Sequence, residues 1–150
     1  MTEFSLGPIQ NLPDNWAAIS IGRFRQQKSQ TFNPVSAKEA AYELYSVPSH
    51  ATGKPEIVSP SEIGSNKQHV APGDVLISKI NPRLNRTWTV GEKGELTQIA
   101  STEWVVFPRS EVLDPSFLKR LLSDYRLRDF LAANGSGVGG SLTRIRPDLF

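Results

Sequence analysis

The chain has 150 residues, 38% hydrophobic and 21% charged, which allows one domain with its own core. It has no cysteine, which excludes disulfides and thiolate metal sites, and its net charge of +2 is too small to indicate a nucleic-acid partner by itself. No apolar run is long enough to cross a bilayer and no signal peptide is evident, so we expect a cytoplasmic protein with no membrane partner.

Two strands are predicted in the first half of the chain, at residues 17–24 and 41–47, because both stretches are rich in β-branched and aromatic residues. Trp16 follows a turn and is expected to anchor the core, as are Trp104 and Phe117 further along. Proline and glycine punctuate residues 48–74, so long irregular structure is expected there, with a short helical turn at 61–63.

The second half begins with a predicted strand at residues 75–80, which Pro82 ends because proline has no amide to donate to a sheet. Residues 86–90 and 95–100 are predicted to pair as a hairpin. Residues 101–107 are apolar on both faces, which predicts a strand in the centre of a sheet.

A helix is predicted to begin at Asp114-Pro115, because aspartate caps free amides and proline suits the first helical position. Its first apolar stripe comprises Phe117, Leu118, Leu121, Leu122 and Tyr125. A second set, Leu127, Phe130 and Leu131, falls on nearly the opposite face of the same ideal helix. We therefore predict a break at residues 123–126 between two short helices, the second capped by Asn134-Gly135. Strands first and helices late predict an α+β fold: a mixed or antiparallel twisted sheet with long loops and a broken C-terminal helix pair packed on it.

Enzyme motifs find little support in this sequence. The stretch "GSGVGG" at 135–140 fits a dinucleotide-binding pattern by spacing, but it follows a helix where a strand is required. His50 and His69 are the only histidines, and both are expected on the surface. A small hydrolase that uses one of them is the weakest of three functional hypotheses. No cofactor and no metal are predicted.

The distribution of charge is more informative. Three stretches contain no acidic residue, namely 15–38, 75–91 and 130–147. They hold nine of the seventeen basic residues, whereas the remainder holds eight basic and all fifteen acidic residues, a net charge of −7. A surface that combined the three stretches would suit a phosphate backbone, and the asparagines and glutamines among them could pair with base edges.

Four motifs in order, "LPDNWAAISIGRF", "APGDVLISKINP", "QIASTEWVVFP" and "LDPSFLKRLLSDYRLRDFLAANGSGVGGSLTRI", resemble a target recognition domain of the specificity subunit of type I restriction-modification systems. The resemblance covers Leu12 to Arg146. It implies a non-catalytic module, a single target recognition domain over residues 1–150, that binds duplex DNA and directs methyltransferase and restriction subunits to one half of a split site.

The chain stops at Phe150, where that family continues into helices and a second recognition domain. Two expectations follow. The chain is either a truncated fragment or a half-subunit that pairs with a second copy or a second recognition domain, and it binds DNA weakly alone.

The candidate DNA-binding residues combine cations with amides or hydroxyls. The primary candidates are Lys79, Asn81, Arg83, Asn85 and Arg86, with the cations for phosphate or base contact and the asparagines as base readers. The secondary candidates are Lys54, Lys67, Arg144, Ser136 and Ser141, the two serines belonging to the loop 135–141. The competing hypothesis is a protein-interaction module of the same complex with no independent DNA binding.

Overall fold

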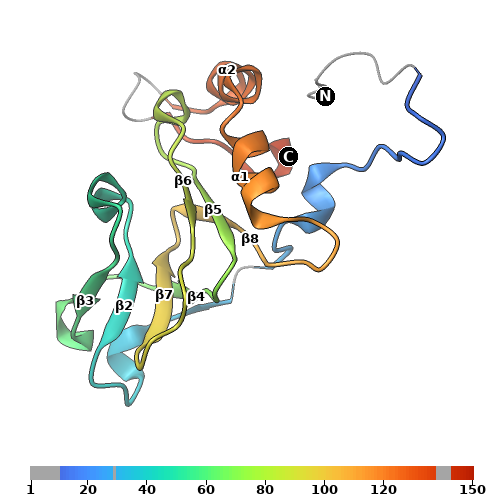
Figure 1. Cartoon of the computed structure of the whole chain (residues 1–150). Helices are drawn as coiled ribbons and strands as arrows, with labels where there is room; N and C mark the ends of the chain where they lie inside the picture. Colours follow the sequence, from blue (N-terminus) through green and yellow to red (C-terminus); the bar gives the residue numbers. More distant parts are fainter. Residues whose placement is uncertain (1–10, 29, 138–142) are drawn as a thin grey trace.

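The strand Val75–Ser78 (β5) is the centre of a three-stranded antiparallel sheet in the computed structural model, which describes residues 11–28, 30–137 and 143–150. Its neighbours are Thr87–Thr89 (β6) and Trp104–Phe107 (β8) (Figure 1). All four residues of β5 and of β8 are buried, as expected for strands that are covered on both faces.

A second sheet has five strands in the order β1-β4-β7-β2-β3. They are β1 (Thr31–Phe32), β2 (Tyr42–Tyr45), β3 (Glu56–Val58), β4 (Lys67–His69) and β7 (Thr97–Ser101). β2 pairs with β7 in parallel and the other pairs are antiparallel, so the predicted mixed sheet is confirmed. The chain passes from the five-stranded to the three-stranded sheet within residues 102–103.

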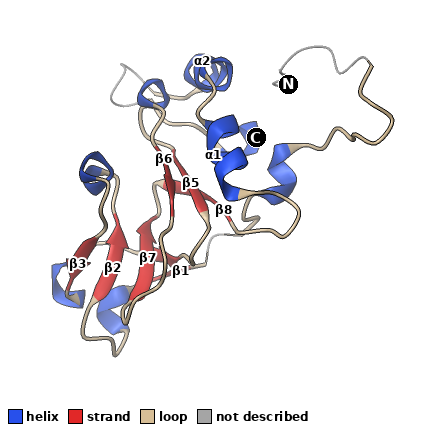
Figure 2. Ribbon diagram, in the orientation of Figure 1, coloured by secondary structure: helices blue, strands red, loops and turns tan. Residues whose placement is uncertain are grey.

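The three-stranded sheet lies between two apolar cores because its side chains alternate between its faces. Val75 and Ile77 of β5 pack with the leucines of the C-terminal helices. Leu76 faces the other way and packs with Trp88, Trp104 and side chains of the five-stranded sheet. Figure 2 shows the resulting arrangement, with the C-terminal helices at one end and the five-stranded sheet at the other.

The predicted break in the C-terminal helix is confirmed. The helices are Pro115–Leu122 (α1) and Tyr125–Asn134 (α2). Asp114 Oδ1 accepts hydrogen bonds from the first amides of α1, and Asp124 Oδ1 accepts one from Arg126 N. With the break in place, the buried leucines of both helices enter one core, and the α+β fold with a broken helix pair is confirmed.

Several predicted strands and pairings were wrong. Residues 17–24 form no strand but end in a 3₁₀ turn, Ile21–Phe24, because the chain there finds no strand to pair with. The predicted hairpin is absent because β6 and β7 belong to different sheets. β8 is an edge strand although it is buried, and the stretch 48–74 contains the unpredicted strands β3 and β4.

Two expected core anchors are on the surface instead. Trp16 is 67% exposed and Phe117 is 59% exposed, whereas Trp104 is buried as predicted. The Asn134-Gly135 cap was also wrong, because Gly135 is extended (φ −69°, ψ 157°). Asn134 Nδ2 instead donates to Phe130 O (2.8 Å), and Gly135 lacks a Cβ that would collide with Thr143.

Within the described parts of the chain, neither α1, α2 nor any 3₁₀ turn has the length and hydropathy needed to cross a bilayer.

Candidate nucleic-acid interface

The segment 81–86 forms a tight loop between β5 and β6, here called the β5–β6 loop (Figure 1). Its centre is the 3₁₀ turn Pro82–Leu84, flanked by two asparagines with positive φ, Asn81 at 48° and Asn85 at 41°. Asparagine adopts this left-handed conformation more easily than most residues, and proline suits the first position of the turn. The sequence thereby holds Arg83 and Leu84 exposed at the tip.

The base of the β5–β6 loop is fixed by the C-terminal segment. Asn81 N donates to Thr143 O (2.8 Å), and Ile145 N donates to Lys79 O (2.8 Å). Ile80 and Arg144 form an isolated antiparallel bridge. Parts of two of the three acid-free stretches, 75–91 and 130–147, therefore lie side by side.

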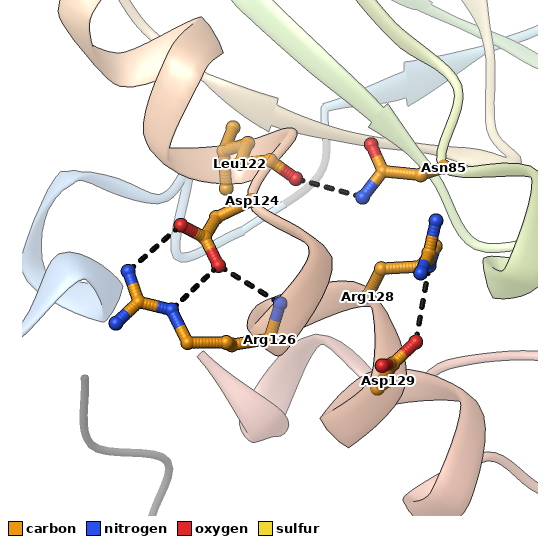
Figure 3. Close-up of polar contacts among 6 residues, drawn as sticks. All are labelled: Asn85, Leu122, Asp124, Arg126, Arg128 and Asp129. Carbon is orange, nitrogen blue, oxygen red and sulfur yellow. Dashed lines mark hydrogen bonds and ion pairs between the residues drawn. The ribbon is translucent and has the colours of Figure 1, made fainter. Parts of the chain in front are cut away.

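The other side of the loop is tied to the break between the helices. Asn85 Nδ2 donates to Leu122 O (3.0 Å), at the C-terminal end of α1 (Figure 3). Next to it, the hydroxyls of Thr87 and Ser123 form a hydrogen bond of 2.9 Å. Helix carbonyls at a C-terminus lack partners within the helix, so Asn85 satisfies one of them and links the loop to α1.

We expect Asn85→Gly to lower the free energy of unfolding by about 1 kcal/mol, the contribution of one hydrogen bond. Asn85→Ala should cost about 1 kcal/mol more, because alanine also resists the positive φ that glycine adopts freely. Urea unfolding of both variants followed by circular dichroism measures the two terms. Equal stability of the alanine variant and the native protein would contradict this role.

The arginines at the start of α2 are neutralised by neighbouring carboxylates, as Figure 3 shows. Arg126 pairs with Asp124 (2.9 Å) and Arg128 with Asp129 (3.1 Å). Hydrogen bonds from Arg126 lower the pKa of Asp124 to about 2, so this carboxylate stays charged at neutral pH. Arg83, by contrast, makes no hydrogen bond or ion pair with any residue that the structure describes. Its charge is therefore available to a ligand.

Other predicted residues lie near this loop but are partly engaged. Lys79 Nζ donates to Thr102 O (2.8 Å), and burial lowers the pKa of Lys79. Arg86 Nη1 contacts Ile80 O at 3.4 Å. Arg144 is exposed and pairs with Glu103 (3.1 Å). Ser136 is exposed, and its backbone pairs with that of Arg144 through two hydrogen bonds.

Two of the predicted residues that the structure describes are not brought to the loop. Lys54 is exposed beyond the 3₁₀ turn Pro48–Thr52, whose teal ribbon stands apart from the β5–β6 loop in Figure 1. Lys67 is only 7% exposed, and its ammonium donates to the carbonyl and hydroxyl of Ser65. Ser141 lies outside the described residues.

Of the two histidines expected on the surface, His69 is exposed and His50 is not. His50 is half-buried, with Nε2 3.0 Å from Thr87 O and its ring edge-on to Trp88. His69 is exposed and stacks on Phe32 at 4.2 Å. In residues 11–28, 30–137 and 143–150, no three histidine, aspartate or glutamate side chains are grouped as metal ligands.

Arg25 was not among the DNA-binding residues predicted from the sequence. Its guanidinium has no partner among the described residues, and its Nε is buried. It belongs to the first acid-free stretch, so the charge pattern was the signal that could have singled it out. Its backbone neighbour Gln26 N donates to Val106 O (2.8 Å), which brings this stretch to the edge strand β8.

No protein-family model and no curated protein matches the sequence. Solved structures do share its fold. One is the HsdS subunit from Thermoanaerobacter tengcongensis, with a TM-score of 0.73 and 18% identity over 94% of this chain and 37% of that chain. Another is a chain from a structure that concerns complex assembly and conformational transition of the type I R-M system, with a TM-score of 0.72 and 19% identity over 92% of this chain and 36% of that chain.

The chain thus spans little more than a third of the length of these neighbours. At the level of the fold, the match confirms the resemblance to a type I specificity subunit that the motifs predicted. The chain has the fold of part of an HsdS subunit.

Proposed function

We propose that this chain is a non-catalytic module that reads one half of a split duplex DNA site through the β5–β6 loop. The observation that carries the proposal is an exposed arginine, Arg83, without a partner among the described residues, on a loop fixed at both sides by hydrogen bonds. Preorganised cations of this kind bind DNA phosphates or guanine edges without a large ordering cost. The shared fold with HsdS supports the same role.

The roles proposed here for Asn81 and Asn85 differ from the base-reading roles predicted from the sequence. Adenine recognition by asparagine uses both the oxygen and the nitrogen of the amide. Asn85 Nδ2 is engaged by Leu122 O, and the Oδ1 atoms of both Asn81 and Asn85 are buried. We therefore assign both asparagines to shaping the loop, Arg83 to base or phosphate contact, and Lys79 and Arg86 to phosphates.

The proposal includes partners. The chain would direct methyltransferase and restriction subunits of the type I kind to its half-site in the cytoplasm, together with a second recognition domain or a second copy of itself. Linkage of two modules raises the affinity for a split site far above that of either module.

The decisive experiment is a selection from random duplexes, with and without a type I methyltransferase subunit from the same genome. A short fixed half-site among the recovered duplexes is the expected result. Recovery of random sequences under both conditions would overturn the proposal.

A protein-interaction module without DNA binding is the second candidate. The observation in its favour is a group of exposed apolar side chains on and before the helices, with Val112 81%, Phe117 59% and Tyr125 63% exposed. Association with the methyltransferase subunit that is insensitive to salt, combined with no affinity for duplex DNA, would favour it.

A further inference from the structure

A cleft separates the N-terminal segment from the edge strand β8. The hydrogen bond from Gln26 N to Val106 O holds the segment against β8, and Lys79 also lines the cleft. The cavity has a volume of about 170 Å³. One water requires about 10–15 Å³ of this measure, so the cleft has room for a small polyatomic ion and several waters.

Among the described residues, the polar lining of this cleft consists of two cations and three glutamines. Arg25 and Lys79 both line it, and no aspartate or glutamate does. Burial lowers the pKa of Lys79, and the charge of Glu103 opposes that shift; Glu103 already pairs with Arg144 at 3.1 Å. Among the described residues, no acidic side chain lines the cleft to compensate the positive charge of Arg25 and Lys79.

The unused donors in the cleft belong mainly to these two cations. Gln68 and Gln27 also line it, but the Nε2 atoms of both donate to backbone carbonyls. The guanidinium of Arg25 has no hydrogen bond or ion pair with the described residues, and its Nε is buried. Lys79 Nζ donates to one acceptor among the described residues, Thr102 O, which leaves further N–H donors. A buried charged donor without an acceptor is destabilising, so an anion that accepted from both would stabilise the site.

We propose that this cleft binds a phosphate group between Arg25 and Lys79. Arginine offers a planar fork that matches two phosphate oxygens, and lysine adds a compact charge. The phosphate could belong to the backbone of duplex DNA or to a free phosphate. A DNA phosphate as the ligand rests on the proposed function. It fits that function because Lys79 lies two residues before Asn81, so the cleft and the β5–β6 loop share one end of the three-stranded sheet.

The test uses the 150-residue chain with two probes, inorganic phosphate and a pool of duplex DNA. Nuclear magnetic resonance follows the Nε–H signal of Arg25 during phosphate titration, a readout that needs no variant. We expect a saturable shift at Arg25 and none at Arg23, an exposed arginine of the same segment that does not line the cleft. Absence of the shift at Arg25 overturns the proposal, whatever the DNA results.

Variants identify the source of the phosphate. If the cleft binds a DNA phosphate, Arg25→Gln should weaken duplex binding about tenfold. It should also reduce the slope of log K against log salt by about 0.9. The control variant Arg23→Gln should have a smaller effect on affinity. Equal duplex binding by the two variants, with the phosphate shift retained in the native chain, assigns the cleft to a free phosphate. Arg25→Lys, which retains the charge, should preserve part of the binding. A native chain that shifts with phosphate but has no affinity for DNA refutes the proposed function and leaves this inference standing.

Discussion

Replacement of both Arg83 and Arg86 by glutamine is expected to weaken duplex DNA binding about 100-fold. A hydrogen bond from a charged group contributes about 1.5–3 kcal/mol, and each 1.4 kcal/mol changes the affinity by a factor of ten. The slope of log K against log salt should fall by about 1.8, since each phosphate contact releases counterions and contributes about 0.9. Fluorescence anisotropy with a labelled duplex at several salt concentrations measures both quantities.

The matched control is the double variant Lys38→Gln and Lys93→Gln. It removes the same charge from two exposed lysines that flank the five-stranded sheet, away from the β5–β6 loop. We expect it to change affinity and salt slope far less. If the two double variants weakened binding equally, the β5–β6 loop would have no special part in it, and only the overall charge of the chain would matter.

The loop can present these arginines at low entropic cost because its supports are local and rigid. Asn81 is bonded to the C-terminal segment and Asn85 to the end of α1. Both supports are anchored in one core with β5, the C-terminal segment through Ile145 and α1 through Leu118 and Leu122. A side chain held in this way loses less freedom on binding than one on an unsupported loop.

Local signals in the sequence predicted the helices well. Asp114 and Pro115 fixed the start of α1, and the two opposed sets of leucines required a break near residue 123. Strand pairing depends on partners distant in the sequence, and there the prediction failed. The apolar pattern of β6 and of β7 was recognised, but nothing local could tell that they belong to different sheets.

The candidate site was predictable to a similar extent. The acid-free stretches drew attention to two segments that the structure brings together, at Ile80 and Arg144. They could not reveal which cations are compensated, because Glu103 reaches Arg144 from outside those stretches. Lys67 appeared as available as Arg83 in the sequence, yet one is buried against Ser65 and the other is exposed.

One buried aromatic side chain, Trp104, links the two sheets. Trp104 of β8 is 1% exposed and donates from Nε1 to Tyr45 O of β2 (2.9 Å). Its ring lies 6.2 Å from that of Trp88 and 6.0 Å from that of His50. It therefore combines a large buried surface with a polar group that has a partner, as a buried tryptophan requires.

Trp104→Ala is expected to lower the free energy of unfolding by about 3–5 kcal/mol, the usual cost of truncating a buried aromatic residue. Trp104→Phe should cost less, because it keeps a ring and loses the Nε1 donor to Tyr45 O, worth about 1–3 kcal/mol. Trp16→Ala is the matched control: this side chain is 67% exposed, and its removal should change stability by no more than about 0.5 kcal/mol. Urea unfolding followed by circular dichroism compares the three variants. Truncation at a close-packed junction leaves a cavity that the neighbouring side chains cannot fill, so a large cost is expected. A cost below about 1 kcal/mol for Trp104→Ala would mean that other contacts hold the two sheets together.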